Sequence, residues 1–175
     1  ICTDKTGTLT VGEMTVRALY VSGKIYSVTG EGYGPEGKII FDGNKIESIH
    51  ARPLLELATN LIGCNNATLK NEDGNWKVIG DPTEGAMLSA GIKAGGNQEQ
   101  INKEMPKQYE FPFDSDRKRS TVVRKMRDGK FRVLTNGGPG ILLQLCTHLY
   151  TSEGIRELTD QDRVNILAET TTMAK

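Results

Sequence analysis

The sequence TVVRKMRDGKFRVLT at residues 121–135 places two runs of β-branched and apolar residues on either side of an Asp-Gly turn. Such runs are typical of strands, and Asp-Gly between them is a strong signal for a tight hairpin. Residues 14–21 and 25–28 form a second pair of this kind, and shorter runs at 39–41 and 76–79 have a similar composition. Because hairpins build antiparallel sheets, the pattern predicts a mainly antiparallel arrangement.

Helices are predicted by apolar spacing and by capping residues. Residues 52–64 carry leucine, alanine and isoleucine at intervals of three and four, which indicates one apolar face packed in the core. A helix from 82 to about 94 begins at the capping box D-P-T-E of residues 81–84, with proline at its first position, and stops at a Gly-Gly pair. Two further helices are expected at 141–149 and 159–173, both covering a sheet.

Composition limits the classes of partner and cofactor. The 175 residues suffice for one domain, and 22 basic against 22 acidic side chains leave no overall field that favours nucleic acid or an anionic membrane. Cys2, Cys64 and Cys146 are widely spaced, which disfavours a disulfide scaffold or a structural zinc site and fits a reducing compartment. His50 and His148 are isolated and are expected to be structural or solvent-facing. No apolar run approaches the roughly 20 residues that a membrane-spanning helix needs.

The segment Asp4-Lys5-Thr6-Gly7-Thr8 places a carboxylate, an ammonium group, two hydroxyls and a glycine close together in the sequence. This set suits phosphoryl transfer, because an aspartate can attack a phosphate, a lysine offsets charge on its oxygens, and glycine lets backbone N–H groups approach. The longer stretch C-T-D-K-T-G-T-L-T at residues 2–10 closely resembles the phosphorylation signature of the P-type cation-transporting ATPases.

The resemblance implies that Asp4 becomes the aspartyl-phosphate within a catalytic segment that includes Lys5, Thr6 and Thr8. It also implies that Mg²⁺ is held by Asp4, by the backbone of Thr6 and by a later aspartate. No stretch of the sequence resembles the family's T-G-D or G-D-G-x-N-D motifs, which complete the phosphorylation domain, so the Mg²⁺ site is predicted to be incomplete. We therefore expect this chain alone to bind ATP with little or no hydrolysis.

Two further motifs resemble nucleotide-binding segments of the same family. The motif G-D-P-T-E-G-A, which begins at residue 80, is similar to the family's G-D-P-T-E-x-A and implies that Glu84 contacts the adenine amino group, favouring adenine over guanine. The motif E-F-P-F-D-S-D-R-K-R-S, which begins at residue 110, resembles E-F-P-F-x-S-x-R-K-R-M-S and implies that Phe113 stacks on adenine and Lys118 reaches the nucleotide. Such stacking contributes about 1–3 kcal/mol. Phe111 is instead expected to point into the core.

A third motif departs from the family pattern. L-T-N-G-G-P-G at residues 134–140 occupies the place of the family's K-G-A-P-E, so that the pocket lysine is Asn136, the alanine is Gly138 and the closing glutamate is Gly140. Asn136, Gly137 and Gly138 remain candidate nucleotide-binding residues, because an asparagine can donate hydrogen bonds and glycines permit a close backbone approach. The missing charge is expected to weaken ATP binding by about 1–3 kcal/mol.

The resemblance implies an α+β fold, with a twisted, mainly antiparallel sheet of about six strands and helices on both of its faces. Residues 1–12 would be the phosphorylation-motif segment at the edge of the phosphorylation domain. Residues 13–175 would be the nucleotide-binding domain, truncated before its last strand and hinge. The motifs T-L-T-x-x-E-M-T-V and G-Y-x-P-x-G, at residues 8–16 and 32–37, favour a calcium-type pump.

The implied function is that of the cytosolic ATP-binding domain of a P-type cation pump, with calcium as the expected ion. It would present the γ-phosphate of ATP to Asp4, with ATP and Mg²⁺ as cofactors, so the parent protein would be an enzyme. The expected partners are ATP and the phosphorylation, actuator and membrane domains of the pump, with no nucleic acid. The chain itself is expected to be a soluble monomer at the cytosolic face of a membrane.

Two other interpretations of the sequence stay open. The chain could be a degenerate nucleotide domain that serves as a regulatory or docking module, which the residues at Asn136 and Gly140 favour. It could also be a free-standing dehalogenase-like phosphatase that uses Asp4. That class predicts a second aspartate two residues on, where this chain has Thr6, which argues against it.

Overall fold

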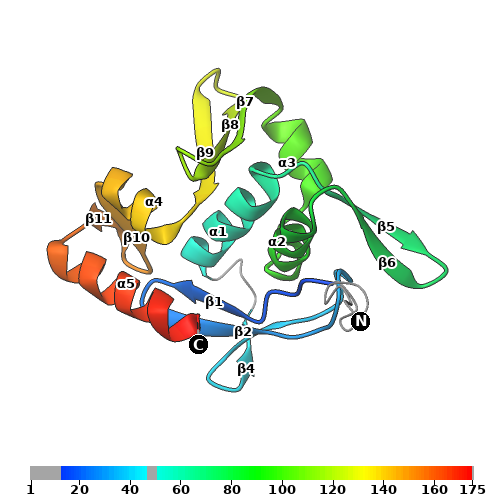
Figure 1. The fold of residues 1–175 in the computed structure, drawn as a ribbon, viewed down its shortest axis with the longest axis horizontal. Coiled ribbons are helices and arrows are strands. Elements are labelled where there is room, and N and C mark those ends of the chain that lie inside the picture. Colours follow the sequence, from blue (N-terminus) through cyan, green and yellow to red (C-terminus); the bar gives the residue numbers. More distant parts are fainter. Residues whose placement is uncertain (1–12, 47–50, 175) are drawn as a thin grey trace, which may run out of the picture.

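The computed structural model describes residues 13–46 and 51–174 of the chain. Hairpins and helices follow one another along these residues, which confirms the predicted α+β class (Figure 1). The strands are β1 (Ala18–Val21), β2 (Lys24–Val28), β3 (Ile39–Phe41), β4 (Asn44–Lys45), β5 (Thr68–Glu72), β6 (Asn75–Ile79), β7 (Lys107–Asp114), β8 (Arg119–Lys125), β9 (Phe131–Gly137), β10 (His148–Thr151) and β11 (Gly154–Glu157). The helices are α1 (Arg52–Gly63), α2 (Pro82–Lys93), α3 (Gln98–Glu104), α4 (Pro139–Leu145) and α5 (Asp160–Met173). No described helix is both long enough and apolar enough to cross a membrane.

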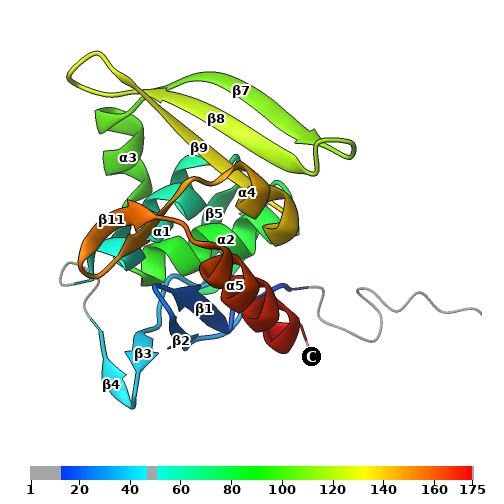
Figure 2. The same ribbon diagram turned by 90° about the vertical axis from the view of Figure 1, so that its left-hand side faces the viewer.

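The described strands form several antiparallel sheets, whereas the sequence predicted one sheet of about six strands. The order is β1-β2-β3-β4 in one sheet and β7-β8-β9 in another, while β5-β6 and β10-β11 are two-stranded. Helices α1 and α2 lie between the four-stranded and the three-stranded sheet in both ribbon views (Figures 1 and 2). Helix α1 contacts both of these sheets, which keeps them apart, so the layers run sheet, helix, sheet.

The four-stranded sheet packs its apolar face on α1. Tyr26, Val28 and Ile39 are buried on that face and form one core cluster with Leu54 and Ala58 of α1. The two helix residues are four positions apart and therefore lie on the same stripe of the helix. The apolar stripe that the sequence predicted for this helix is thus confirmed as core.

Helix α2 lies close to its neighbours because glycines face the contacts. A Cβ on Gly91 would lie 2.7 Å from Ile62 Cγ1 of α1, and a Cβ on Gly85 would lie 2.2 Å from Val78 Cγ2 of β6. Ile62 and Leu88 are almost wholly buried in a second core cluster beside these glycines. Larger residues at positions 85 or 91 would push α2 outward, so the small residues set how closely it lies against α1 and β6.

The three-stranded sheet turns one face to α1 and leaves the other face exposed. Val122 and Leu134 are buried and cluster with Cys64 at the end of α1. Phe111 lies opposite Thr121 of β8, and 52% of Phe111 is exposed. Successive residues of a strand alternate between faces, and the face of Val122 is the one that meets α1. The prediction that Phe111 points into the core was therefore wrong.

The C-terminal helices are less buried than the sequence predicted. The helix expected at 141–149 is α4, which ends at Leu145 because Cys146 has an extended backbone (φ −81°, ψ 136°). Strand β10 then begins at His148 and pairs with β11. Helix α5 is capped by Thr159. Neither α4 nor α5 contains a buried residue, so both helices lie nearer the surface than α1.

Candidate nucleotide-binding site

Glu84 lies in the first turn of α2, which begins where the sequence predicted. Asp81 Oδ1 accepts hydrogen bonds from the N–H groups of Thr83 at 2.8 Å and Glu84 at 3.1 Å, and Pro82 is the first helical residue. The bond from the N–H of Glu84 is the main cause that lowers the pKa of the Asp81 carboxyl. The Glu84 carboxylate is directed to the end of α1, where its Oε2 accepts from the N–H of Asn66 at 3.0 Å.

Phe113 and Lys118 flank the turn between β7 and β8. The Phe113 side chain is 67% exposed, and a register shift interrupts the pairing of β7 with β8 beside it. Asp114 closes the turn, because its Oδ1 accepts from the N–H groups of Asp116 at 3.0 Å and Arg117 at 2.8 Å. The bond from Arg117 is the main cause that lowers the pKa of the Asp114 carboxyl. The Phe113 ring is therefore open to a stacking partner beside an ordered turn.

The same turn is joined to the end of β9 through glycine. The N–H of Gly138 donates to the carbonyl oxygen of Lys118 at 3.2 Å, and Gly137 lies opposite Arg119. A Cβ on Gly137 would lie 2.6 Å from that Lys118 oxygen, so any larger residue would force the strand and the turn apart. The structure thus brings Lys118, Gly137 and Gly138 together.

Asn136, the residue before this glycine pair, is directed at α1. Its Nδ2 donates to the carbonyl oxygen of Cys64 at 2.8 Å, and its Oδ1 accepts from Asn60 Nδ2 at 2.6 Å. Asn60 Nδ2 also donates to the carbonyl of Thr135 at 3.3 Å. The Asn136 side chain therefore fastens β9 to α1, and both ends of its amide already bind the protein.

The sequence did not lead us to predict that the residues directly after α1 contribute to the candidate site. Asn65 Nδ2 donates to the carbonyl oxygen of Glu84 at 2.7 Å, next to the bond from Asn66 described above. Cys64 Sγ lies 3.8 Å from the hydroxyl and the carbonyl oxygen of Ser120, and burial raises the pKa of its thiol. A signal was present, because asparagines directly after a helix are typical of capping turns.

The candidate nucleotide residues thus form two connected groups. Glu84 and Asn136 are both tied to the end of α1. Phe113, Lys118 and the Gly137-Gly138 pair surround the β7–β8 turn. Asn136 precedes Gly137 directly on β9, so one strand carries members of both groups. The first turn of α2, held at the end of α1, therefore supplies a carboxylate, and the β7–β8 turn supplies an aromatic ring with a cation.

The predicted catalytic residues Asp4, Lys5, Thr6 and Thr8 lie outside the described residues, and the predicted Mg²⁺ site lies there with them. Among the residues that the structure describes, no three His, Cys, Asp or Glu side chains are grouped so that they could hold a metal ion. The described residues therefore bear on nucleotide binding and not on the Mg²⁺ site.

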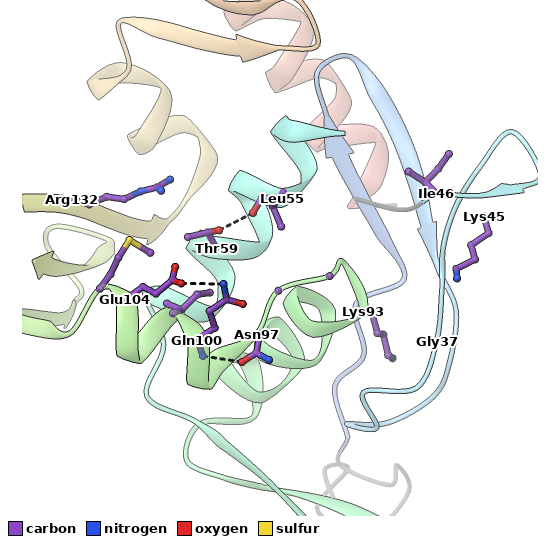
Figure 3. A pocket seen from close by; sticks show the side chains of 14 residues that line it. Gly37, Lys45, Ile46, Leu55, Thr59, Lys93, Asn97, Gln100, Glu104 and Arg132 are labelled. Carbon is purple, nitrogen blue, oxygen red and sulfur yellow. Dashed lines mark hydrogen bonds between the residues drawn. The ribbon is translucent and has the colours of Figure 1, made fainter. Parts of the chain in front are cut away.

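Cavities are found on other parts of the molecule. One of about 760 Å³ lies beside α1 and α3, and its lining includes Thr59, Lys93, Asn97, Gln100 and Arg132 (Figure 3). Two others, of about 490 and 290 Å³, lie against the β10–β11 hairpin. None of these three is lined by the candidate nucleotide residues. The candidate nucleotide residues therefore lie outside these three cavities.

Comparisons with known proteins identify the class of the chain. Residues 53–175 match the family described as P-type ATPase, cytoplasmic domain N. The chain is 38% identical over 150 residues to a calcium-transporting ATPase of Bacillus subtilis, covering 86% of this chain and 17% of that relative. It is 35% identical over 182 residues to the cation-transporting ATPase pma1 of Synechocystis sp., covering 100% of this chain and 19% of that relative.

A eukaryotic relative belongs to the same class of protein. The chain is 31% identical over 167 residues to calcium-transporting ATPase type 2C member 1 of Bos taurus, covering 93% of this chain and 17% of that relative. The chain therefore belongs to the P-type ATPases, and its residues 53–175 belong to their cytoplasmic domain N. It spans less than a fifth of the length of these curated relatives.

Proposed function

We propose that this chain binds ATP as the nucleotide domain of a cation pump and presents the γ-phosphate to Asp4 for aspartyl-phosphate formation in the whole pump. In this proposal residues 1–12 belong to the phosphorylation domain and residues 13–175 to the nucleotide domain. Two of the relatives above are named as calcium-transporting, which supports calcium as the ion. The parent would then be a membrane-bound ATPase, and the phosphorylation, actuator and membrane domains would be partners of this monomeric domain on its cytosolic side.

The observation that carries the proposal is the exposed ring of Phe113 beside an ordered turn that also holds Lys118. An exposed aromatic face gains about 1–3 kcal/mol when a base stacks on it, and any base can do so. The selection of adenine would come from Glu84, because its carboxylate accepts a hydrogen bond from the amino group of adenine, whereas guanine presents a carbonyl there. Lys118 would supply the positive charge for the phosphates, a task that the neutral Asn136 cannot perform.

Mg²⁺ would be bound by the segment outside the described residues. Mg²⁺ bound at Asp4 and Thr6 would neutralise charge on the transferred phosphate. The described residues would bind the base, orient the phosphates and leave the reaction itself to Asp4. For this reason we expect the isolated chain to bind ATP with little turnover.

The test is an isotope-edited NMR titration of the 175-residue chain with ATP, ADP and GTP, beside the variant Phe113→Ala. We expect saturable shifts near Glu84, Phe113 and Lys118 with the adenine nucleotides, and their loss in the variant. Phe131→Ala is the matched control, because Phe131 is also a largely exposed phenylalanine of this sheet but starts β9 at the opposite end. Absence of shifts at millimolar ATP, or equal loss in both variants, would refute ATP binding at this site.

A second candidate function is that of a regulatory or docking module that has lost the ability to bind ATP. It is favoured by the Asn136 side chain, which is neutral and is bound at both ends to Asn60 and Cys64. This alternative predicts no saturable shift with any nucleotide in the same titration, so one experiment separates the two functions.

A further inference from the structure

Asn65 is a buried polar residue in the turn that follows α1. Its side chain is 7% exposed and makes three hydrogen bonds. Nδ2 donates to the carbonyl oxygens of Leu61 at 3.0 Å and Glu84 at 2.7 Å, and Oδ1 accepts from the N–H of Ala67 at 2.8 Å. Both amide hydrogens and the amide oxygen are therefore engaged, and they join the last turn of α1 to the first turn of α2.

The hydrogen bond from the N–H of Ala67 to Asn65 Oδ1 fixes the direction of the N–H group of Asn66, the residue between them. An asparagine oxygen that accepts from the N–H two residues on closes a small ring, which holds the backbone in a defined turn. In this turn the N–H of Asn66 donates to Glu84 Oε2 at 3.0 Å. Asn65 thus binds the backbone carbonyl of Glu84, and Asn66 binds its carboxylate.

The side chain of Asn66 extends the connection to the three-stranded sheet. Its Oδ1 accepts from Lys107 Nζ at 2.7 Å, and its Nδ2 donates to Glu110 Oε1. Lys107 and Glu110 also pair directly at 2.9 Å, and the bonds from Lys107 and Asn66 lower the pKa of the Glu110 carboxyl. Glu110 is on β7, three residues before Phe113. The Asn65-Asn66 turn therefore links the Glu84 carboxylate to the strand that carries the exposed ring.

We propose that Asn65 is a positioning residue of the adenine site, which holds the Glu84 carboxylate where it accepts the hydrogen bond from the amino group of adenine. The proposal rests on the function proposed above and adds a residue that does not itself touch the nucleotide. Its consequence is specific: loss of Asn65 reduces the preference for ATP over GTP, because stacking on Phe113 and attraction to Lys118 are shared by both nucleotides.

The experiment compares the dissociation constants of ATP and GTP for the wild-type chain, Asn65→Ala and Glu84→Ala. We expect the ATP preference to fall roughly tenfold in Asn65→Ala, the size of one lost hydrogen bond to a charged group, with little change in GTP affinity. The carboxyl ¹³C shift of Glu84, measured in the same samples without nucleotide, is expected to move as well.

Asn97→Ala is the matched control for a general loss of stability. Asn97 Oδ1 accepts from the N–H of Gln100 at 2.9 Å and caps α3, so this variant also loses an asparagine bond to the backbone. We expect its ATP preference and its Glu84 shift to equal those of the wild-type chain. If Asn65→Ala does not fold, Asn65→Asp gives the comparison, because it keeps the acceptor for Ala67 and removes both donors.

The outcomes separate the two proposals. A wild-type chain that binds ATP and GTP equally would refute adenine selection by Glu84, and the role of Asn65 with it. A wild-type preference that is lost in Glu84→Ala but retained in the folded Asn65 variant, with an unmoved Glu84 shift, would refute the role of Asn65 alone. An equal loss of preference in Asn97→Ala would show that stability and not positioning is responsible.

Discussion

Helices α1 and α5 are similar in length but are held in different ways. Helix α1 has 12 residues and buries Leu54, Ala58, Ile62 and Gly63, while α5 has 14 residues and buries none. The start of α5 is stabilised by nearby residues, because Thr159 and Asp162 form a reciprocal capping box. Helix α1 has no side-chain cap at its start and no basic residue in its last turn. The stability of α1 therefore depends on contacts with distant parts of the chain. Helix α5 depends instead on its own cap and on Arg163, which binds the carbonyl oxygens of Leu143 and Cys146 at the end of α4.

Residues distant in the sequence cap the C-terminal end of α1 by donating hydrogen bonds to its last carbonyl groups. Arg124 Nε donates to the carbonyl of Gly63 at 2.7 Å, and Asn136 Nδ2 donates to that of Cys64 at 2.8 Å. A cation at this end of a helix also opposes the negative end of its dipole. Arg124 is only 3% exposed, and this burial lowers the pKa of its guanidinium. The same helix end orders the Glu84 carboxylate, so the candidate site depends on the region held by tertiary contacts.

The largest loss of stability is expected from a substitution where α1 meets the four-stranded sheet. Leu54 is wholly buried there, and Leu54→Ala should lower the free energy of unfolding by about 2–5 kcal/mol through lost burial and the cavity left behind. Urea unfolding measures the change. Leu167→Ala on α5 is the control, because Leu167 is 43% exposed and its truncation should change stability by no more than about 0.5 kcal/mol. Equal effects in the two helices would contradict the comparison.

A smaller effect is expected at the cap of α1. Asn136→Ala removes the donor to the carbonyl of Cys64 and one of the two acceptors of Asn60 Nδ2, which should destabilise the chain by about 1–3 kcal/mol. Urea unfolding again gives the value, and amide hydrogen exchange should show the loss in the last turn of α1. Unchanged exchange at Cys64 and its neighbours would argue against the capping role.

The smallest effect is expected at α5 and depends on pH. Arg156 donates to both oxygens of Asp162, at 2.7 and 2.8 Å, and with Thr159 it holds the pKa of this carboxyl well below its ordinary value of 3.8. A lowered folded pKa means that the stabilisation is present above pH 3.8 and is lost as pH falls through the folded value. The melting temperature of Asp162→Asn should therefore lie below that of the wild-type chain at pH 7, and the gap should shrink below pH 3.8. A gap that persists undiminished at pH 2 would contradict this assignment.

The sequence predicted the elements whose signals are local. The apolar spacing of 52–64 and the Asp81 cap gave α1 and α2 to within a residue or two, and the Asp-Gly turn gave the β8–β9 hairpin. The helix expected at 141–149 was too long, because its apolar spacing continues past Cys146 while the backbone does not. Helix α3 was not predicted, since its short run has few apolar residues.

The site was harder to predict because its contacts are tertiary. Glu84 has a suitable position for a local capping box, yet its carboxylate binds Asn66, which lies 18 residues earlier. The exposure of Phe111 depends on which face of the sheet meets α1, and alternation along one strand does not contain that information. The binding of Asn136 to Asn60 and Cys64 likewise follows from the packing of β9 on α1 and not from the motif around it.

The caps of α1 also set an order of events during synthesis. Arg124 follows Gly63 by 61 residues and Asn136 follows Cys64 by 72, so the ribosome must deliver both strands before the end of this helix is complete. Contacts this far apart in sequence close loops slowly. A nascent chain that stops before β8 would lack both donors, so the carbonyl groups of Gly63 and Cys64 would stay without these caps until β8 and β9 have docked.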